Sequence, residues 1–323
     1  MKFKKLGKIF DPSDSFLLKN DFVGFAQSPQ ALVFDDFIRI YFSIRKKSNN
    51  GKFLSHIQFI DVTKNLEKII NYSQNEVIKL GMPGTFDEHG IFPFNVIRLD
   101  NIVYGYISGW TRRVSVSVDT GIGLSVSHDN GTTFQRIADG PILSSSLYEP
   151  FLVGDPFVQM YEGVFHMWYI FGTEWKKDPT NNGYERVYKI GHCTSLDGIN
   201  WHKQGKPIIK DNYENECQAL PSVIKINDIY HMYFCYRQPF NFRADKEMGY
   251  RIGYAYSQDL LTWIRDDSKA GITLSDSGWD SEMMCYPHIF KCDEEIYLLY
   301  NGNEFGKYGF GAARLENYGT PYL

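Results

Sequence analysis

Acidic residues stand at set distances before a repeated proline, and their type and spacing suit acid–base chemistry. Glu88, Glu216 and Glu282 each precede a proline by five residues, whereas Asp155 directly precedes Pro156. Where several carboxylates converge, they repel one another and their pKa values are driven apart. Such a separation is what a general acid and its partner base require. The alternative is that each acid is a repeated structural device that accepts backbone N–H bonds.

Basic and aromatic residues form a second group, in segments that follow the prolines. Its members are Arg45, Lys46, Lys47, Trp110, Arg112, Arg113, Trp175, Lys176, Lys177, Arg237 and Arg243. Guanidinium groups bind phosphate or carboxylate through paired hydrogen bonds, and a tryptophan ring can stack on the apolar face of a sugar. His89 and His288 also lie near the prolines and are further candidates for a site that the acidic and basic residues share. The alternative for the charged residues is that they are ordinary solvated loop residues.

The prolines themselves recur at intervals of 63 to 66 residues, at positions 29, 93, 156, 221 and 287. Each opens the same pattern, a short apolar run, a turn and then a strand rich in aromatic residues. A unit of about four strands must bury its faces against neighbours, so the repeat predicts an all-β, five-bladed β-propeller. We expect a single domain over residues 1–323. The blades are predicted at approximately 24–81, 84–146, 149–212, 214–276 and 279–323, with 3–10 added to the last.

The start of the chain is predicted to complete the last blade. Residues 3–8 resemble residues 201–206, which lie where an outermost strand is expected. We therefore expect residues 3–10 to pair beside residues 309–315, which closes the ring and leaves no open strand edge. Within the blades, three Ser-x-Asp turns are predicted to be structural, because such side chains bond to their own backbone. These turns begin at Ser127, Ser195 and Ser257.

The composition excludes several classes of protein. A net charge of −4 argues against a nucleic-acid binder, which normally carries a basic surplus. No run approaches about 18 apolar residues and no apolar segment follows the basic start, so we expect no membrane span and a cytoplasmic location. The five cysteines lack metal-type spacing and are predicted to be reduced and mostly buried. No cofactor is expected. The sequence shows no recognisable set of residues that would bind a central metal ion.

Several short motifs together resemble a known superfamily. Asp155-Pro156, the Ser-x-Asp-Gly-x-x-Trp turn that starts at Ser195, and Glu216-Cys217 look like motifs of the five-bladed propeller glycosidases. That superfamily includes arabinanases, xylosidases, invertases and levansucrases, with related mannoside phosphorylases. The resemblance implies a site of three carboxylates: a first-blade aspartate as base or nucleophile, a second aspartate that tunes a pKa, and a glutamate as acid. By its context, Asp155 matches the second aspartate and Glu216 matches the acid.

The first blade departs from this pattern. It reads Gln27-Ser28-Pro29 where the resembling hydrolases have an aspartate, and a serine without an adjacent base cannot replace that group. Glycosidic cleavage by water needs two carboxylates, roughly 5–5.5 Å apart for retention or 6.5–9.5 Å for inversion. Either Asp87 or Glu88 supplies the missing group, or the reaction uses an anionic nucleophile or a nucleotide leaving group.

Three hypotheses follow. The first is a carbohydrate-active enzyme of glycoside-hydrolase type, with Glu216 as proton donor, Asp155 as orienting carboxylate and Asp87 as the second catalytic carboxylate. The second is a phosphorylase or glycosyltransferase-like enzyme that acts on phosphate-bearing sugars. The third is a non-catalytic propeller that binds a glycan or a protein. The residues expected to contact a substrate, which could itself be anionic or phosphorylated, are Ser28, Glu88, His89, Trp110, Arg112, Arg113, Trp175, Arg237, Glu282 and His288.

Overall fold

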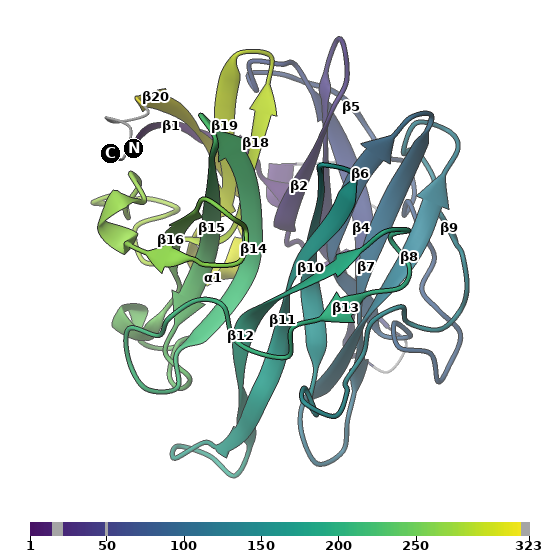
Figure 1. Cartoon of the computed structure of the whole chain (residues 1–323), viewed down its shortest axis with the longest axis vertical. Helices are drawn as coiled ribbons and strands as arrows, with labels where there is room; N and C mark the ends of the chain where they lie inside the picture. The colour runs from purple at the N-terminus through teal and green to yellow at the C-terminus, as the bar shows by residue number, and fades with distance from the viewer. Residues whose placement is uncertain (15–21, 49–50, 318–323) are drawn as a thin grey trace.

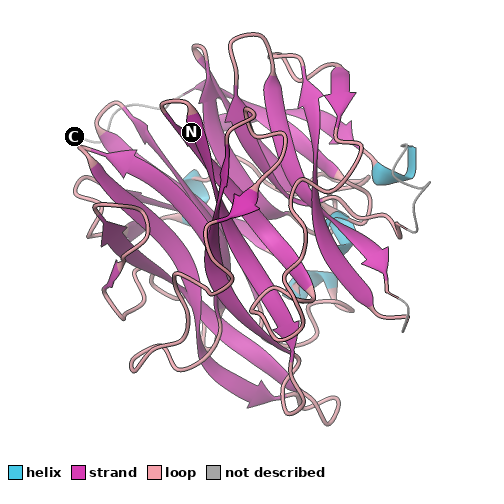
Figure 2. Ribbon diagram, turned by 90° about the vertical axis from the view of Figure 1, so that its right-hand side faces the viewer, coloured by secondary structure: helices cyan, strands magenta, loops and turns pink. Residues whose placement is uncertain are grey.

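The computed structural model describes residues 1–14, 22–48 and 51–317, and nearly all of their regular structure is β-strand (Figure 2). The strands form five antiparallel units of four. In chain order they are β2 (Gln27–Val33), β3 (Ile38–Lys47), β4 (Phe53–Val62) and β5 (Ile69–Tyr72); β6 (Gly90–Leu99), β7 (Ile102–Arg112), β8 (Val118–Ser127) and β9 (Gln135–Arg136); β10 (Val153–Tyr161), β11 (Val164–Lys177), β12 (Tyr184–Ser195) and β13 (His202–Lys203); β14 (Cys217–Ile226), β15 (Ile229–Arg237), β16 (Arg251–Ser257) and β17 (Ile264–Arg265); and β18 (Cys285–Cys292), β19 (Glu295–Asn301), β20 (Phe310–Asn317) and β1 (Lys2–Phe10).

These units are the blades of the predicted propeller. The first strand of each blade contacts the first strands of the blades before and after it, so β2, β6, β10, β14 and β18 close a ring (Figure 1). The first two blades are also joined at their edges by one parallel pair, between Ser55 and Gly90. The only helical segments in the described residues are short: three 3-10 turns at Pro12–Asp14, Lys246–Met248 and Asp267–Lys269, and α1 (Asn303–Gly306).

The N-terminal strand closes the last blade, as predicted. β1 runs antiparallel to β20, with Phe3 opposite Leu315 and Phe10 opposite Phe310. Both phenylalanines of β1 are buried, so the strand contributes to the core as well as to the hydrogen-bonded ladder. The closure removes the free edge that β20 would otherwise present to solvent.

Aromatic side chains fill the space between blades. Trp168 of the third blade is fully buried, with its ring centroid 6.2 Å from that of Trp263 on the fourth. Tyr41 of the first blade makes an edge-to-face contact at 5.9 Å with Phe94 of the second. Such pairs add about 0.5–1.5 kcal/mol beyond the burial of their area. The high aromatic content of the sequence is therefore used to hold neighbouring blades in place.

The Ser-x-Asp turns are structural, as expected. In each turn the serine hydroxyl and the aspartate carboxylate bond to each other, at 2.6 Å for Ser127 and Asp129 and at 2.9 Å for Ser195 and Asp197. The carboxylate also accepts backbone N–H bonds from the turn that follows, which lowers the pKa of Asp129. The five cysteines are buried and unpaired, as predicted.

The repeated prolines mark a break in the innermost strands. The register shifts where the proline lies, in all five blades. The residue before the proline has a left-handed backbone in four of them, with φ of 54° at Ser28, 51° at Asp155, 45° at Leu220 and 56° at Tyr286. In the second blade Phe92 precedes its proline through a cis peptide bond. An extra residue of this kind redirects a side chain out of the ladder, and bulges are common next to functional sites.

Candidate functional site

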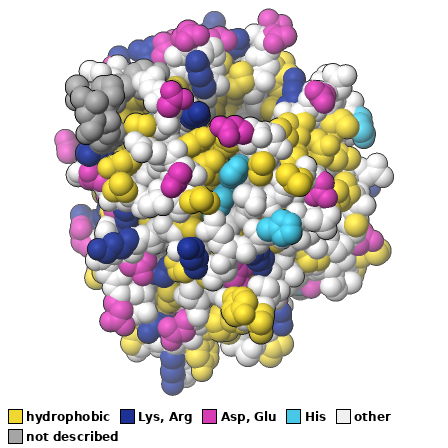
Figure 3. Space-filling model, viewed as in Figure 1, with side chains coloured by type: hydrophobic (Ala, Val, Ile, Leu, Met, Phe, Trp, Pro, Cys, Tyr) yellow, Lys and Arg dark blue, Asp and Glu magenta, His cyan; other side chains and the backbone are white. Residues whose placement is uncertain are grey.

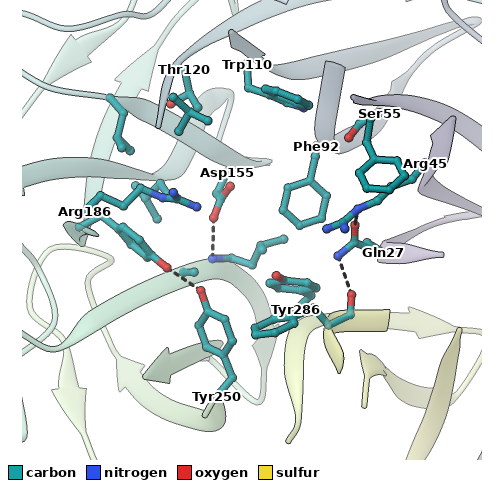
Figure 4. A pocket seen from close by; sticks show the side chains of 18 of the residues that line it. Gln27, Arg45, Ser55, Phe92, Trp110, Thr120, Asp155, Arg186, Tyr250 and Tyr286 are labelled. Atoms are coloured by element: carbon teal, nitrogen blue, oxygen red, sulfur yellow. Dashed lines mark hydrogen bonds between the residues drawn. The ribbon is translucent and has the colours of Figure 1, made fainter. Parts of the chain in front are cut away.

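A cavity of about 650 Å³ lies at the end of the ring where these irregular positions meet (Figure 4). All five blades line it, through Gln27, Phe92, Asp155, Leu220 and Tyr286 among others. Four of these five residues directly precede a repeated proline. The bulges therefore build the floor of the cavity.

Asp155 is the only acidic residue lining this cavity among the described residues. Its side chain is mostly buried, and one carboxylate oxygen accepts a 3.4 Å hydrogen bond from the backbone N–H of Leu220. Its own backbone N–H donates to the Ser108 hydroxyl at 3.1 Å. Burial raises the pKa of Asp155 to about 7, while the Leu220 N–H and the charge of Arg186 act in the opposite direction. Asp155 can therefore hold a proton at neutral pH and release it to a bound molecule.

Cationic side chains surround this single acid. Those that line the cavity are Arg45, Lys52, Arg112, Arg186, Arg237 and Arg243. The surface as a whole differs, because the chain has a net charge of −4 and acidic and basic side chains are interspersed over the face in Figure 3. The excess of positive charge is thus local to the cavity. A recessed site of one sign concentrates ligands of the other, so the cavity suits an anion.

Arg237 is held rigidly in the wall of the cavity by neutral groups. It is 1% exposed, donates from Nη1 to the carbonyls of Gln238 at 2.7 Å and Pro239 at 3.2 Å, and donates from Nε to the Tyr188 hydroxyl at 3.2 Å. Its guanidinium lies 3.5 Å from the centre of the Phe242 ring. These contacts fix the geometry of the guanidinium without neutralising its charge. The guanidinium of Arg237 is therefore already oriented and can bind an anionic ligand.

A tyrosine pair supports this arginine. The hydroxyls of Tyr188 and Tyr250 are 2.5 Å apart (Figure 4), and both residues line the cavity. Neither tyrosine was predicted as a site residue. A sequence pattern could have identified them, because each is the first residue of a Tyr-x-Ile-Gly motif at the third strand of its blade. In the same way, the position before each proline identifies Phe92, Leu220 and Tyr286 as partners of Asp155.

Aromatic rings supply the apolar walls. Trp110 lines the cavity, with the His89 ring 5.9 Å away and nearly parallel to it and the Arg112 guanidinium 5.1 Å from its centre. Phe92 and Tyr286 meet edge to face at 5.1 Å. Rings held in this way offer flat apolar surfaces on which a sugar can stack. The structure thus places the predicted residues Trp110 and Arg112 in the same cavity as Asp155 and Arg237.

The structure does not bring the other two predicted catalytic carboxylates to the cavity. Glu216 is fully buried and lies 2.6 Å from Arg265, and Asp87 is fully buried in an ion pair with Arg136, whose Nε is 3.0 Å away. In both pairs the cation belongs to the outermost strand of the same blade. The physical reason is that a buried carboxylate requires a charge partner, and the blade provides one.

This pairing is repeated in two further blades. Glu149 bonds to Lys203 at 2.5 Å in the third blade, and Asp280 bonds to Lys5 at 2.7 Å in the fifth. Four blades therefore contain a buried acid, located before the innermost strand, that binds a cation of the outermost strand. We call this arrangement the blade clasp. Glu216 therefore has a structural role, as the alternative for the repeated acids allowed, but its charged partner is a cation, which that alternative did not include.

The remaining predicted residues lie at the rim or away from the cavity. Glu88 contacts His89 at 3.2 Å, beside Trp110, and Arg113 pairs with Asp119 on the surface. Ser28 is buried on the same bulge as Gln27. Residues that do not line this cavity are Ser28, Glu88, His89, Arg113, Trp175, Glu282 and His288.

Three of these have other surroundings. Trp175, on β11, packs against a core cluster that extends from the third blade to the fifth. His288 is buried on β18, and burial lowers its pKa to about 3, so it is neutral. Glu282 lines a smaller neighbouring cavity of about 460 Å³, which shares Arg45, Phe242, Arg243 and Phe305 with the main one.

Residues 1–14, 22–48 and 51–317 contain no group of three or more His, Cys, Asp or Glu side chains arranged to hold a metal ion. No helix among them has the length and apolar character needed to cross a membrane.

Comparison with known proteins gives relatives that match over their full length. The chain is 30% identical over 323 residues to the uncharacterized protein Rv1502 of Mycobacterium tuberculosis (strain H37Rv), which covers 98% of this chain and 100% of that protein. A 1,2-beta-oligomannan phosphorylase of Thermoanaerobacter sp. (strain X514) is 27% identical over 154 residues, which is 46% of this chain and 48% of that enzyme. No family model matches the chain.

Solved structures share the fold. A glycoside hydrolase superposes with a TM-score of 0.72 at 16% identity, covering 99% of this chain and 93% of that one. The beta-1,2-mannobiose phosphorylase of Listeria innocua, in complex with beta-1,2-mannobiose, gives a TM-score of 0.67 at 11% identity, covering 97% and 96%. The fold is therefore that of the propeller glycosidases and the related mannoside phosphorylase, as the sequence motifs indicated.

Proposed function

Because this chain belongs to the same family as Rv1502 and has the fold of the propeller glycosidases, we propose that it is a carbohydrate-active enzyme, specifically a glycoside phosphorylase. The enzyme would cleave a glycosidic bond with inorganic phosphate and release a glycosyl phosphate. One observation carries the proposal: a single carboxylate with a pKa of about 7 lies in a cavity lined by six cationic side chains.

The number of carboxylates distinguishes phosphorolysis from hydrolysis. A hydrolase of this kind needs one carboxyl group to protonate the leaving oxygen and a second to activate water or to attack the sugar. The cavity presents only Asp155, since Glu216 and Asp87 are engaged in blade clasps. Phosphate is already an anion and needs no base to act as a nucleophile. The cavity therefore favours phosphate over water.

The reaction follows from this assignment. Protonated Asp155 donates its proton to the glycosidic oxygen as the bond between that oxygen and the anomeric carbon breaks. A phosphate oxygen held by arginines such as Arg186 and Arg237 forms the new bond at the opposite face of the anomeric carbon. The products are a sugar with a free hydroxyl group and a glycosyl phosphate of inverted configuration. Asp155 is left as a carboxylate near Arg186, whose charge stabilises that state.

The two phosphorylase relatives support this proposal and indicate the first substrate to test. Both enzymes are named for activity on β-1,2-linked mannosides, although the sequence match covers only about half of the Thermoanaerobacter enzyme. Trp110, which lines the cavity, is the platform that we assign to the sugar ring.

The test is to incubate the protein with β-1,2-mannobiose and a panel of other disaccharides, with and without inorganic phosphate. We expect a glycosyl phosphate, detected by ³¹P NMR, that forms only when phosphate is present and not with Asp155→Asn. Arg113→Gln, which removes an exposed arginine outside the cavity, is the matched control and should retain activity. Release of free sugar at the same rate without phosphate would instead identify a hydrolase. If the panel yields neither product, the proposed reaction is wrong for these sugars.

A further inference from the structure

The cavity presents arginines on two separate sides. Arg186 lies beside Asp155 on one side, and Arg45 lies beside Gln27 on the other (Figure 4). Phe92 and Tyr286 stand between them, with ring centroids 5.1 Å apart. The two arginines therefore face different parts of the cavity, with aromatic rings between them.

Arg45 is oriented by groups that carry no charge. The Gln27 side chain donates from Nε2 to the Phe305 carbonyl at 2.6 Å, which leaves its oxygen facing Arg45. That oxygen accepts a 3.2 Å hydrogen bond from Arg45 Nε, and the guanidinium stacks at 3.9 Å on the Phe25 ring. No salt bridge in the described part of the chain joins Arg45 to a carboxylate. Its charge is therefore fixed in place without a counter-ion.

A second positive charge lies near Arg45. Burial and the neighbouring Arg243 both lower the pKa of Arg45, since each disfavours the charged form. Arg45 and Arg243 also line both the main cavity and the cavity of about 460 Å³ beside it. Arg243 is 58% exposed and already pairs with Glu185 at 3.1 Å, so Arg45 is the arginine at this junction whose charge has no carboxylate partner among the described residues, and an anion placed here would bond chiefly to Arg45.

We propose that the cavity binds two anions at the same time: phosphate beside Arg186 and Asp155, and, at Arg45 and Arg243, an acidic group that the sugar substrate itself carries. The substrate would then be a phosphorylated or a carboxylated glycan rather than a neutral one. The identity of the first anion rests on the proposed function, whereas the second site rests on Arg45 and its surroundings. The smaller cavity would hold the unit of the glycan that lies beyond the acidic group.

Binding of inorganic phosphate, measured by isothermal titration calorimetry at low ionic strength, tests the number of sites. We expect two phosphate ions per wild-type chain, one per Arg45→Gln chain, and two for Lys47→Gln, a control on the same strand with an exposed side chain outside the cavity. Arg45→Lys keeps the charge without the guanidinium geometry and should bind the second ion at least tenfold more weakly. A single site in the wild type, or two sites in Arg45→Gln, would overturn the proposal.

Competition by sugars identifies the acidic group. Mannose 6-phosphate, glucuronate and neutral mannose are titrated against wild type and Arg45→Gln at a phosphate concentration that fills one site per chain. We expect one acidic sugar to bind at least tenfold more tightly than mannose in the wild type only, and the tighter of the two shows whether the group is a phosphate or a carboxylate. Equal affinity for acidic and neutral sugars contradicts the proposal. Two-site binding without phosphorolysis contradicts the proposed function alone, whereas phosphorolysis with one phosphate site contradicts this inference alone.

Discussion

The carboxylate of Glu216 lies 2.6 Å from the guanidinium of Arg265, and neither side chain is more than 5% exposed. Glu216 directly precedes the innermost strand of its blade, and Arg265 belongs to the outermost. The pair therefore links the innermost and the outermost strand of one blade, which are separated in the sheet by two other strands. Arg265 also bonds to Asp267 at 2.8 Å, so the clasp in this blade has a second acid.

Glu216→Gln should reduce stability much more than activity. Removing one partner of a buried ion pair leaves the other charge uncompensated, and we expect the free energy of unfolding to fall by about 3 kcal/mol. In this variant Arg265 keeps its bond to Asp267, so we expect a loss at the lower end of the range that is usual when a buried ion pair is broken. Urea denaturation measures the change, with Glu214→Gln, an exposed neighbour, as the control. Unchanged stability combined with lost activity would assign a catalytic role to Glu216 after all.

Asp155→Asn should lower the rate without unfolding the protein. Loss of a positioned general acid typically reduces kcat by about 10²–10⁴. In the wild type, activity that depends on the protonated carboxyl group should decline as pH rises through about 7, because that is the pKa of Asp155. Initial rates from pH 5 to 9 measure both effects. A rate that is flat over this range would exclude Asp155 as the acid.

The same pKa predicts a difference in stability. Burial raises the Asp155 pKa from 3.8 in an unfolded chain to about 7, so the native state binds the proton more tightly than the unfolded state. The stability that this provides is complete below pH 3.8 and is lost as pH rises to about 7. Asp155→Asn has no such loss and should exceed the wild type by about 1–4 kcal/mol at pH 8. Denaturation of both proteins at pH 5 and pH 8 tests this, and an identical pH dependence would contradict it.

Deletion of residues 1–10 should open the ring. The deletion removes β1, exposes the edge of β20 and breaks the Lys5–Asp280 clasp. We expect a lower Tm and self-association, because an exposed strand edge pairs with other chains. Thermal melting and size-exclusion chromatography provide the measurement, with the surface variant Lys4→Gln as a control that keeps the strand. A truncated chain with the elution volume and Tm of the full chain would show that the closure is dispensable.

Arg237→Lys should weaken phosphate binding even though the charge is kept. The lysine ammonium cannot reproduce contacts made at once to Gln238, Pro239 and the Tyr188 hydroxyl. We expect KM for phosphate to rise at least tenfold, with a smaller change in kcat. Arg113→Lys, at an exposed arginine outside the cavity, should leave both constants unchanged. An unaltered KM for phosphate in Arg237→Lys would remove this residue from the anion site.

The fold was predictable from the sequence because its signal is repeated. Each proline carries the same bulge, and the similarity of residues 3–8 to residues 201–206 was enough to place β1 beside β20. The site was less predictable. The distance in sequence between an acid and the next repeated proline shows which loop holds the acid, but it does not show where the side chain points. Asp155 and Glu216 both lie in such loops, yet only Asp155 is on the bulge that faces the cavity. The cations of the clasps lie 49 to 54 residues after their acids in three blades, too far for local spacing to reveal.

Ser28 and Asp155 occupy the same backbone position in two different blades, with φ of 54° and 51°. The propeller thus contains a set of equivalent backbone positions, one before each repeated proline. The side chain at each position decides what chemistry that blade can contribute. Aspartate tolerates the left-handed backbone better than most residues, so Ser28→Asp would introduce a second carboxylate without requiring a new main-chain path. Ser28 is buried and does not line the cavity, whereas Asp155 does, so the repeat provides equivalent backbone positions that only some blades use for the site.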